Sequence, residues 1–111
     1  MQAVHILFNL QSQWILVDIE TFKASLQFDH PGQQLSVYLE ALWYEAKNNW
    51  EQAHTLIQDL DTPEAAWIHA YLHRKEGDIA NADYWYREAG KKRPGTSLQQ
   101  EWEHITQSFL D

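Results

Sequence analysis

The residues best suited to chemistry in this sequence are two histidines and a carboxylate at helical spacing. His69 and His73 are four residues apart, and Glu76 follows His69 by seven residues. In a helix these three side chains emerge from one side, turned away from the apolar stripe that includes Trp67. Such a set can ligate zinc, nickel or copper, and His54 on the preceding segment would supply a third nitrogen.

Two features weigh against a metal at these residues. In zinc metalloproteases a Glu directly follows the first His, whereas Ala70 follows His69 here. Histidines at this spacing also form hydrogen bonds between helices, or contact solvent, without any metal. We therefore predict no bound metal or other cofactor, and we keep as the alternative a metal site formed by His54, His69, His73 and Glu76.

A second group of residues combines aromatic rings with guanidinium groups. Trp, Tyr and Arg concentrate binding energy at protein interfaces. Arg74, beside Trp67 and Tyr71 on one helix, is expected either to stack on a ring or to pair with a buried carboxylate. Together with the two histidines, this group is predicted to bind a partner, and its members are Trp67, His69, Tyr71, His73, Arg74, Tyr84 and Arg87.

Three consecutive aromatic residues, 84 to 86, indicate which ring leaves the core. Successive residues turn by about 100° around a helix, so the three rings cannot all face one core. Trp85 and Tyr86 fit the apolar face, and Tyr84 then points elsewhere. With Arg87 it is expected to form part of a groove for a peptide or an anion. In the alternative, Tyr84 covers the neighbouring hairpin and Arg87 pairs with an acid such as Asp83 or Glu88.

The composition excludes several classes of function. A chain of 111 residues is expected to form one domain, and its 44% hydrophobic residues are enough for a core. The chain contains no cysteine, which excludes disulfides, thiol nucleophiles and cysteine-ligated metals. With 16 Asp and Glu against 8 Lys and Arg, the net charge of −8 argues against nucleic-acid binding.

The first 17 residues differ from the rest of the chain in composition and in hydrophobic periodicity. They are apolar without a clear period, so a strand, an irregular extension and a helix all fit them. Polar residues interrupt this stretch well short of the ~20 apolar residues of a membrane span, and it lacks the features of a secretory leader. We expect a cytoplasmic protein that does not contact a membrane, with an N-terminal extension at 1–17 and a single helical domain at 18–111.

Helix start and stop signals are frequent after residue 17. Side chains that cap helix N-termini occur at Asp18, Asn49, Thr62, Asp78 and Ser97. Glycine or proline follows several of the expected helices, as at Gly77 and Pro94. The expected helices cover a short segment from 19 that stops before His30, then 33–47, a helix from 50, 63–76, 79–91 and a helix from 98.

A shift of the chain by 29 positions superposes two of these helical hairpins. Ala41 then falls on Ala70 and Ala53 on Ala82, so small residues recur where paired helices approach closely. Two hairpins that cannot cover their apolar faces alone stack into a short solenoid. The predicted fold is all-α, with two stacked αα-hairpins and flanking capping helices.

The second hairpin resembles the tetratricopeptide repeat in its later half. The residues at that motif's spacing are Gly77, Ala82, Tyr86, Ala89 and Pro94. Its earlier half departs from the motif, and a repeat of 29 residues is shorter than the usual 34. The resemblance implies a tetratricopeptide-like solenoid rather than a standard member of that family.

A longer motif extends over the same segment. It reads W-x-HAYLHRKEGD from Trp67 to Asp78, followed by YWYR from Tyr84 to Arg87. This motif resembles that of a family of small, uncharacterised bacterial helical proteins, and the resemblance covers roughly residues 19 to 110. It implies a helical fold and a role for these residues, and it brings no activity with it.

The function predicted from the sequence is binding rather than catalysis. A repeat, many aromatic residues and the lack of a nucleophile beside a base indicate a non-catalytic tetratricopeptide-like module for a protein or peptide partner. We expect Tyr84→Ala or Arg87→Ala to abolish that binding without changing the melting temperature. The alternative is a small metal- or ligand-binding protein that uses the histidines, and self-association through exposed aromatic residues is a third reading.

Overall fold

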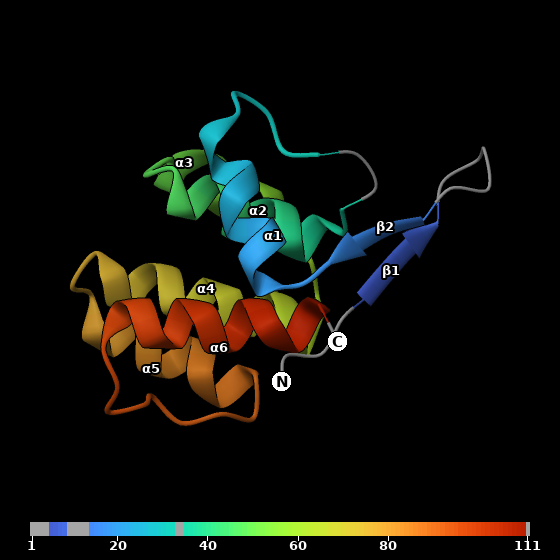
Figure 1. The fold of residues 1–111 in the computed structure, drawn as a ribbon. Helices are drawn as coiled ribbons and strands as arrows, with labels where there is room; N and C mark the ends of the chain where they lie inside the picture. Colours follow the sequence, from blue (N-terminus) through green and yellow to red (C-terminus); the bar gives the residue numbers. More distant parts are fainter. Residues whose placement is uncertain (1–4, 9–13, 33–34, 111) are drawn as a thin grey trace.

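The computed structural model describes residues 5–8, 14–32 and 35–110, and side chains from residue 18 onward. In chain order its elements are β1 (His5–Phe8), β2 (Trp14–Val17), α1 (Ile19–Ala24), the short 3-10 helix η1 (Ser25–Gln27), α2 (Val37–Ala46), α3 (Trp50–Ile57), α4 (Pro63–Lys75), α5 (Ile79–Glu88) and α6 (Leu98–Leu110) (Figure 1).

The N-terminal segment contains a two-stranded antiparallel sheet. His5 lies opposite Val17, and Phe8 lies opposite Trp14. Of the three conformations that fit the sequence of this stretch, the described residues adopt the strand. The hairpin extends away from the helices (Figure 1) and ends directly before Asp18, the N-cap of α1. The chain changes from strand to helix at residue 18, and the division into an extension at 1–17 and a helical domain at 18–111 stays a prediction.

Side-chain caps begin the helices at the residues that the sequence predicts. The hydroxyl of Thr62 accepts a hydrogen bond from the N–H of Ala65 at 3.1 Å, directly before Pro63 at the first helical position. Ser97 and Gln100 form a reciprocal pair, in which each backbone N–H donates to the other's side chain at 3.0 and 3.1 Å. Such a capping box satisfies two N–H groups that the helix itself leaves unpaired.

The helix α2 begins later than the sequence predicts. Its first residue is Val37 rather than a residue near 33, because Ser36 is the N-cap and accepts from the N–H of Leu39 at 3.2 Å. The helix α5 ends at Glu88, earlier than the predicted 91, because Gly90 takes the left-handed conformation with φ of 71°. Both corrections follow from local capping rather than from packing.

The turns after α2 and α4 have the same hydrogen-bonded form. Asn48 has a φ of 64°, and the N–H of Asn49 donates back into the last turn of α2 at 2.9 Å. Gly77 has a φ of 89°, and the N–H of Asp78 donates back into the last turn of α4 at 2.9 Å. These turns lie 29 positions apart, the spacing of the repeat seen in the sequence.

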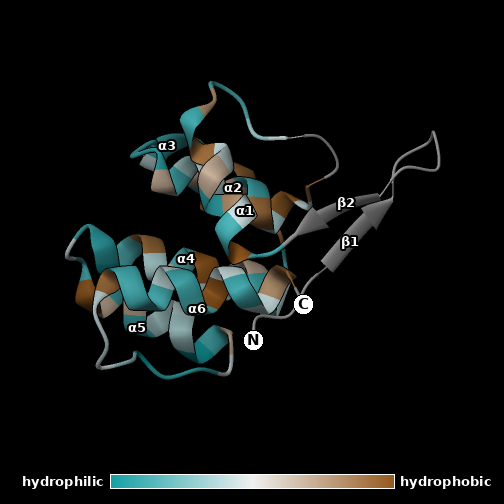
Figure 2. Cartoon of the chain, viewed as in Figure 1, coloured by the Kyte–Doolittle hydropathy of each residue, from teal (hydrophilic) through white to brown (hydrophobic). Residues whose placement is uncertain are grey.

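The helices after residue 17 form the predicted all-α arrangement. Helix α2 packs on α3 and α4 packs on α5, and both helices of the first hairpin contact α4. The flanking helices also take part, since α6 contacts α1, α2 and α4. Figure 2 shows hydrophobic residues where helices face their neighbours and hydrophilic residues on their outer faces. Helix α4 is therefore the central element of the fold.

The apolar stripes of the helices mostly face the core as expected. The largest fully buried apolar side chains are Trp43, Tyr86, Leu42, Ile57, Ile68, Leu72 and Ile105. Leu60 and Ile79 continue the apolar spacing of α3 and α5 but are exposed. Leu60 follows the end of α3 and Ile79 is the first residue of α5, so neither lies within the packed length of its helix.

A search of the described residues for a membrane-spanning segment found no helix with both the length and the apolar character that a crossing requires.

Candidate functional site

The three histidines of the sequence hypothesis converge in the structure. His54 projects from α3 and meets His69 of α4, with their Nε2 atoms 3.0 Å apart. The ring of His73, one turn further along α4, is stacked against that of His69 with a centroid separation of 4.8 Å. One ring nitrogen from each lies within 4.8 Å of the others. We call His54, His69 and His73 the histidine cluster.

Two tryptophans enclose the histidine cluster. Trp50 of α3 stacks on the ring of His54 at a centroid distance of 4.7 Å, and Trp85 of α5 stacks on His69 at 4.0 Å. The indole N–H of Trp50 donates to the carbonyl of Leu72 at 2.8 Å, which fixes this ring between α3 and α4. Two of the imidazoles are thus packed against indole faces. Residues of α3, α4 and α5 together fix the positions of the ring nitrogens.

Among the described residues, the carboxylate that bonds to the histidine cluster is that of Glu76. Its Oε1 lies 2.6 Å from Nδ1 of His73, so that nitrogen carries the proton and donates. The other nitrogen of His73, Nε2, then has a lone pair, and the amide Nδ2 of Asn81 lies 3.4 Å from it. Glu76 therefore sets the tautomer of His73.

Burial favours the neutral form of two rings of the histidine cluster, His54 and His69. Burial lowers the pKa of His69 to about 4, and the neighbouring His54 and His73 add to this effect by charge repulsion. Burial also lowers the pKa of His54, followed by repulsion from His73. Neutral imidazoles have a lone pair on one nitrogen each, which is the form that binds metals and accepts hydrogen bonds.

The burial of this face corrects one expectation. The sequence places His69 and His73 away from the apolar stripe of α4, yet they are only 6% and 7% exposed. The reason is the central position of α4, whose histidine side packs against α3 and α5. Hydrogen bonding between helices, one of the alternatives weighed from the sequence, is what His54 and His69 do.

The opposite side of α4 carries a second polar cluster, which the sequence does not reveal. Its buried carboxylates are Glu45 of α2 and Glu101 of α6. Arg74 donates to Glu101 at 2.7 Å, and the hydroxyl of Tyr86 donates to the other oxygen of Glu101 at 2.6 Å. Lys75 forms an ion pair with Glu45. We call Glu45, Arg74, Lys75, Tyr86 and Glu101 the carboxylate cluster.

Tyr71 lies beside the carboxylate cluster. Its hydroxyl is hydrogen-bonded to Glu45, and burial raises the pKa of Tyr71 well above its usual value, with the charges of Glu45 and Glu101 acting in the same direction. Burial and the hydrogen bond to Glu101 raise the pKa of Tyr86 likewise. Of the two alternatives for Arg74, pairing with a buried carboxylate is the one observed.

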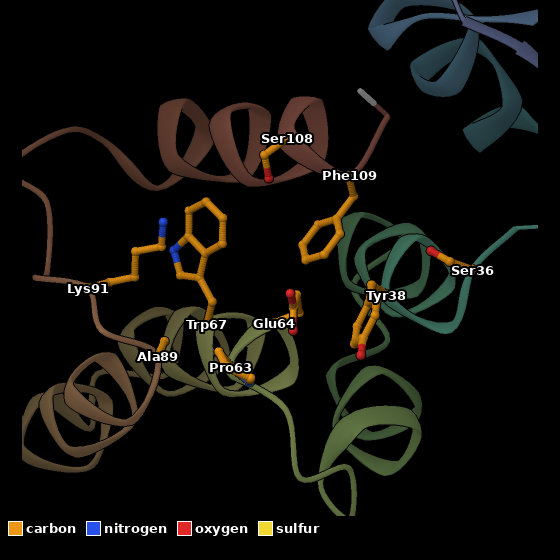
Figure 3. Close-up of a pocket in the computed structure, with 9 residues that line it drawn as sticks. All are labelled: Ser36, Tyr38, Pro63, Glu64, Trp67, Ala89, Lys91, Ser108 and Phe109. Carbon is orange, nitrogen blue, oxygen red and sulfur yellow. The ribbon is translucent and has the colours of Figure 1, made fainter.

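A groove of about 720 Å³ opens between α2, α4 and α6 (Figure 3). Aromatic rings dominate its walls: Tyr38 stacks on Phe109 at a centroid distance of 5.1 Å, and Trp67 lies 6.2 Å from Phe109. The ammonium of Lys91 lies 4.1 Å from the centre of the Trp67 ring. Glu64 projects into the same space from the first turn of α4 (Figure 3). We call this space the aromatic groove.

Two smaller hollows continue the aromatic groove past Lys91. One has a volume of about 360 Å³ and shares Trp67 and Lys91 with the groove. The other, of about 270 Å³, is lined by Arg87, Lys91 and Lys92. Four of the eight Lys and Arg residues of the chain lie between residues 87 and 93. A local excess of positive charge therefore borders one end of the groove.

The residues predicted to bind a partner are divided among these places. Trp67 lines the aromatic groove, and Arg87 lines the smaller of the two hollows beside it. Tyr84 is 46% exposed on α5, pointing out of the core as predicted. His69, Tyr71 and His73 are buried and Arg74 is partly buried, so these four offer little surface to a partner.

Of the residues that line the aromatic groove, the sequence hypothesis included only Trp67, and Tyr38, Lys91 and Phe109 are among those it left out. Tyr38 and Phe109 lie on the apolar stripes of their helices, so their types and spacing indicate core rather than surface. Lys91 follows the end of α5, where a cation interacts favourably with the helix C-terminus without any ligand. Asp83, one of the two acids considered as a partner of Arg87, pairs with Arg93 at 2.8 Å.

Comparisons of the chain with protein-family models, with curated proteins and with solved structures gave no match.

Proposed function

We propose that this protein is a non-catalytic helical module that binds an acidic peptide segment of a partner protein in the aromatic groove. The observation that supports this function is the combination of three aromatic walls with a positively charged border at one end. Aromatic and cationic side chains are the residue types that dominate the energetics of protein interfaces.

The aromatic walls select an apolar side chain of the partner. A volume of about 720 Å³ lies within the range of roughly 300–1,000 Å³ that is typical of ligand sites. Trp67 and Phe109 line this volume from α4 and α6, so a leucine or an aromatic residue of the peptide can pack against their rings. Burial of such a side chain contributes about 1.5–3 kcal/mol to binding.

The charges around the aromatic groove orient the peptide. Lys91 and Lys92 attract carboxylates at one end, whereas Glu64 repels them within the groove. A peptide with an acidic residue next to its apolar anchor therefore binds with the acid toward Lys91. Charge complementarity of this kind gives specificity and speeds association more than it adds affinity.

The resemblances found in the sequence support the same kind of function. Stacked helical hairpins of the tetratricopeptide type present grooves to peptides, and the aromatic groove is formed by the first helices of both hairpins together with α6. We place the protein in the bacterial cytoplasm, because its motif resembles that of a bacterial family and its chain contains no cysteine.

The competing surface is the one formed by Tyr84 and Arg87 on α5. Both side chains are exposed. Arg87 borders the smaller hollow, which shares Lys91 and Lys92 with the larger one. Our proposal assigns Arg87 to the charged border and gives Tyr84 no contact with the peptide. The two surfaces are therefore separated by a single pair of substitutions, Trp67→Ala and Tyr84→Ala.

Selection of peptides from a random display library on the full chain tests this function. We expect the selected peptides to share an apolar residue beside one or two acids. Trp67→Ala should weaken their affinity at least about tenfold in calorimetry, and Lys91→Ala about threefold to tenfold. Tyr84→Ala is the matched control and should change the affinity by less than about twofold.

Two outcomes contradict the proposal. One is a library that yields no acidic peptide after selection, and the other is a set of peptides that lose affinity with Tyr84→Ala and keep it with Trp67→Ala. Because Trp67 is partly buried, thermal unfolding of each variant is measured first. If Trp67→Ala unfolds, Trp67→Leu keeps more of the apolar contact and still removes the aromatic face and its contact with Lys91.

A further inference from the structure

We propose that the histidine cluster is a binding site for a divalent transition-metal ion of the zinc type, with Nε2 of His54, His69 and His73 as its protein ligands. This site is separate from the aromatic groove and does not depend on the proposed peptide function. It lies on the other side of α4, between α3 and α5.

The spacing of the nitrogens is close to what tetrahedral zinc requires. With Zn–N bonds of about 2.0–2.1 Å, neighbouring ligand nitrogens in a tetrahedron lie about 3.3 Å apart. The Nε2 atoms of His54 and His69 are 3.0 Å apart, and all three histidines can bring a nitrogen within 4.8 Å of the others. Small ring rotations, mainly of His73, therefore complete the site.

Glu76 has the place of an outer carboxylate in such a site. A metal-bound histidine usually donates its other ring N–H to a carboxylate, which fixes the tautomer and makes the ligand more basic. The contact of 2.6 Å between Nδ1 of His73 and Glu76 is of this kind. It leaves Nε2 for the ion, which would replace the long contact of 3.4 Å to Asn81.

The ligand set indicates the class of ion. Three imidazoles suit zinc, copper(II) and nickel, whereas magnesium and calcium prefer oxygen ligands and copper(I) prefers sulfur. Three protein ligands leave a fourth tetrahedral position for water. Trp50 and Trp85 stack on two of the ligand rings and limit the water around the rest of the site.

The position of the histidine cluster suggests a structural consequence of metal binding. His54 belongs to the first hairpin, and His69 and His73 belong to the second. An ion bound by all three joins the hairpins at the contact between α3 and α4. Zinc at 100 times its dissociation constant should then raise the melting temperature of the full chain by about 10 °C.

A second set of groups, at the turn between α4 and α5, competes with this assignment. His73, Glu76 and Asp78 also come within 4.8 Å of one another, but both acids are exposed. Asp78 is already the N-cap of α5, where its side chain accepts from the N–H of Asn81 at 3.3 Å. Asp78→Asn distinguishes the two sets, because it removes a ligand from the second and leaves the histidine cluster intact.

Titration of the metal-free full chain with zinc by calorimetry, and with cobalt(II) by visible absorption, tests the proposal. We expect one ion per chain and the intense absorption of tetrahedral cobalt. His54→Gln should weaken zinc binding about 100-fold or more, and Glu76→Gln about 10–100-fold. His104→Gln is the matched control, because it removes an exposed histidine of α6 and should change nothing.

The proposal is wrong if zinc and cobalt give no one-to-one complex, if His54→Gln binds zinc as the unmodified chain does, or if Asp78→Asn abolishes binding. Circular dichroism establishes that each variant is folded. His54 is only half-buried, so His54→Gln carries the test even if His73→Gln does not fold.

Discussion

Helix α4 separates two clusters of buried ionisable groups, and these clusters offset the cost of burying polar groups in different ways. In the carboxylate cluster, charged groups pair with charged groups: Arg74 with Glu101, and Lys75 with Glu45. In the histidine cluster burial lowers the pKa values of His54 and His69, and the rings contact one another and the faces of Trp50 and Trp85. One cluster depends on paired charges, whereas in the other burial favours the uncharged form of two rings.

This difference indicates which cluster is available for a ligand. A buried carboxylate that already accepts from an arginine and a tyrosine, as Glu101 does, has its strongest partners within the protein. Neutral imidazoles that bond to one another lose little when an ion takes the place of that bond, because metal ligation uses the same lone pairs. The carboxylate cluster therefore anchors α6, and the histidine cluster is the one with capacity to bind.

The largest expected effect comes from removing a charge in the carboxylate cluster. Glu101 is 3% exposed, and Glu101→Gln leaves the guanidinium of Arg74 without its counter-charge. We expect the free energy of unfolding in urea to fall by about 3 kcal/mol. Glu103→Gln, which breaks the exposed pair with Lys23, should cost less than about 1 kcal/mol. A similar small loss for both variants would contradict the charge dependence of this cluster.

Acid should weaken the fold through the histidine cluster. The pKa of His69 is lowered to about 4 in the folded chain from 6.5, so between these values the unfolded chain binds the proton and the folded chain does not. Stability therefore falls as the pH decreases from 6.5 toward 4, by about 3 kcal/mol for this group. Urea unfolding across this pH range measures the slope.

The slope is assigned by two histidine variants. His69→Gln should flatten the dependence of stability on pH in this range, and His104→Gln should leave it as in the unmodified chain. If His69→Gln keeps the full dependence of stability on pH, the acid sensitivity arises from another group, and burial does not keep His69 neutral in this pH range.

The smallest expected effect is Glu76→Gln in the absence of metal. The side chain of Glu76 is 40% exposed, and the glutamine oxygen can still accept from Nδ1 of His73. We expect unfolding in urea to change by less than about 1 kcal/mol, in contrast to the same substitution at Glu101. A loss as large as that of Glu101→Gln would mean that the histidine cluster also depends on charge.

Much of the secondary structure could be predicted from the sequence, because helix ends depend on residues within three or four positions. The N-caps at Asp18, Asn49, Thr62, Asp78 and Ser97 and the left-handed Gly77 all act locally. The later start of α2 at Ser36 was missed, although it is local as well. The helical repeat could be predicted because both hairpins use the same kind of turn.

The sites could be predicted only in part, because their geometry depends on partners far along the chain. The spacing of His69 and His73 predicts that they share one side of a helix, but only packing of α3 on α4 brings His54 to them. The burial of Glu45 and Glu101 depends on Lys75 and Arg74, 30 and 27 residues away. No local pattern distinguishes these two acids from those on the surface.

We propose that the two sides of α4 bind different ligands. A peptide binds at the aromatic groove, and a metal ion binds at the histidine cluster. Indole N–H signals in proton–nitrogen NMR spectra report on both sides of the full chain at once. Trp67 lines the groove, whereas Trp50 and Trp85 stack on the histidines. The measurement is one pair of titrations, with a selected acidic peptide and with zinc.

We predict that the peptide shifts the Trp67 signal and leaves those of Trp50 and Trp85 in place, and that zinc does the reverse. A peptide that shifts Trp50 and Trp85 but not Trp67, or a zinc titration that moves none of the three signals, would contradict the assignment of these sites.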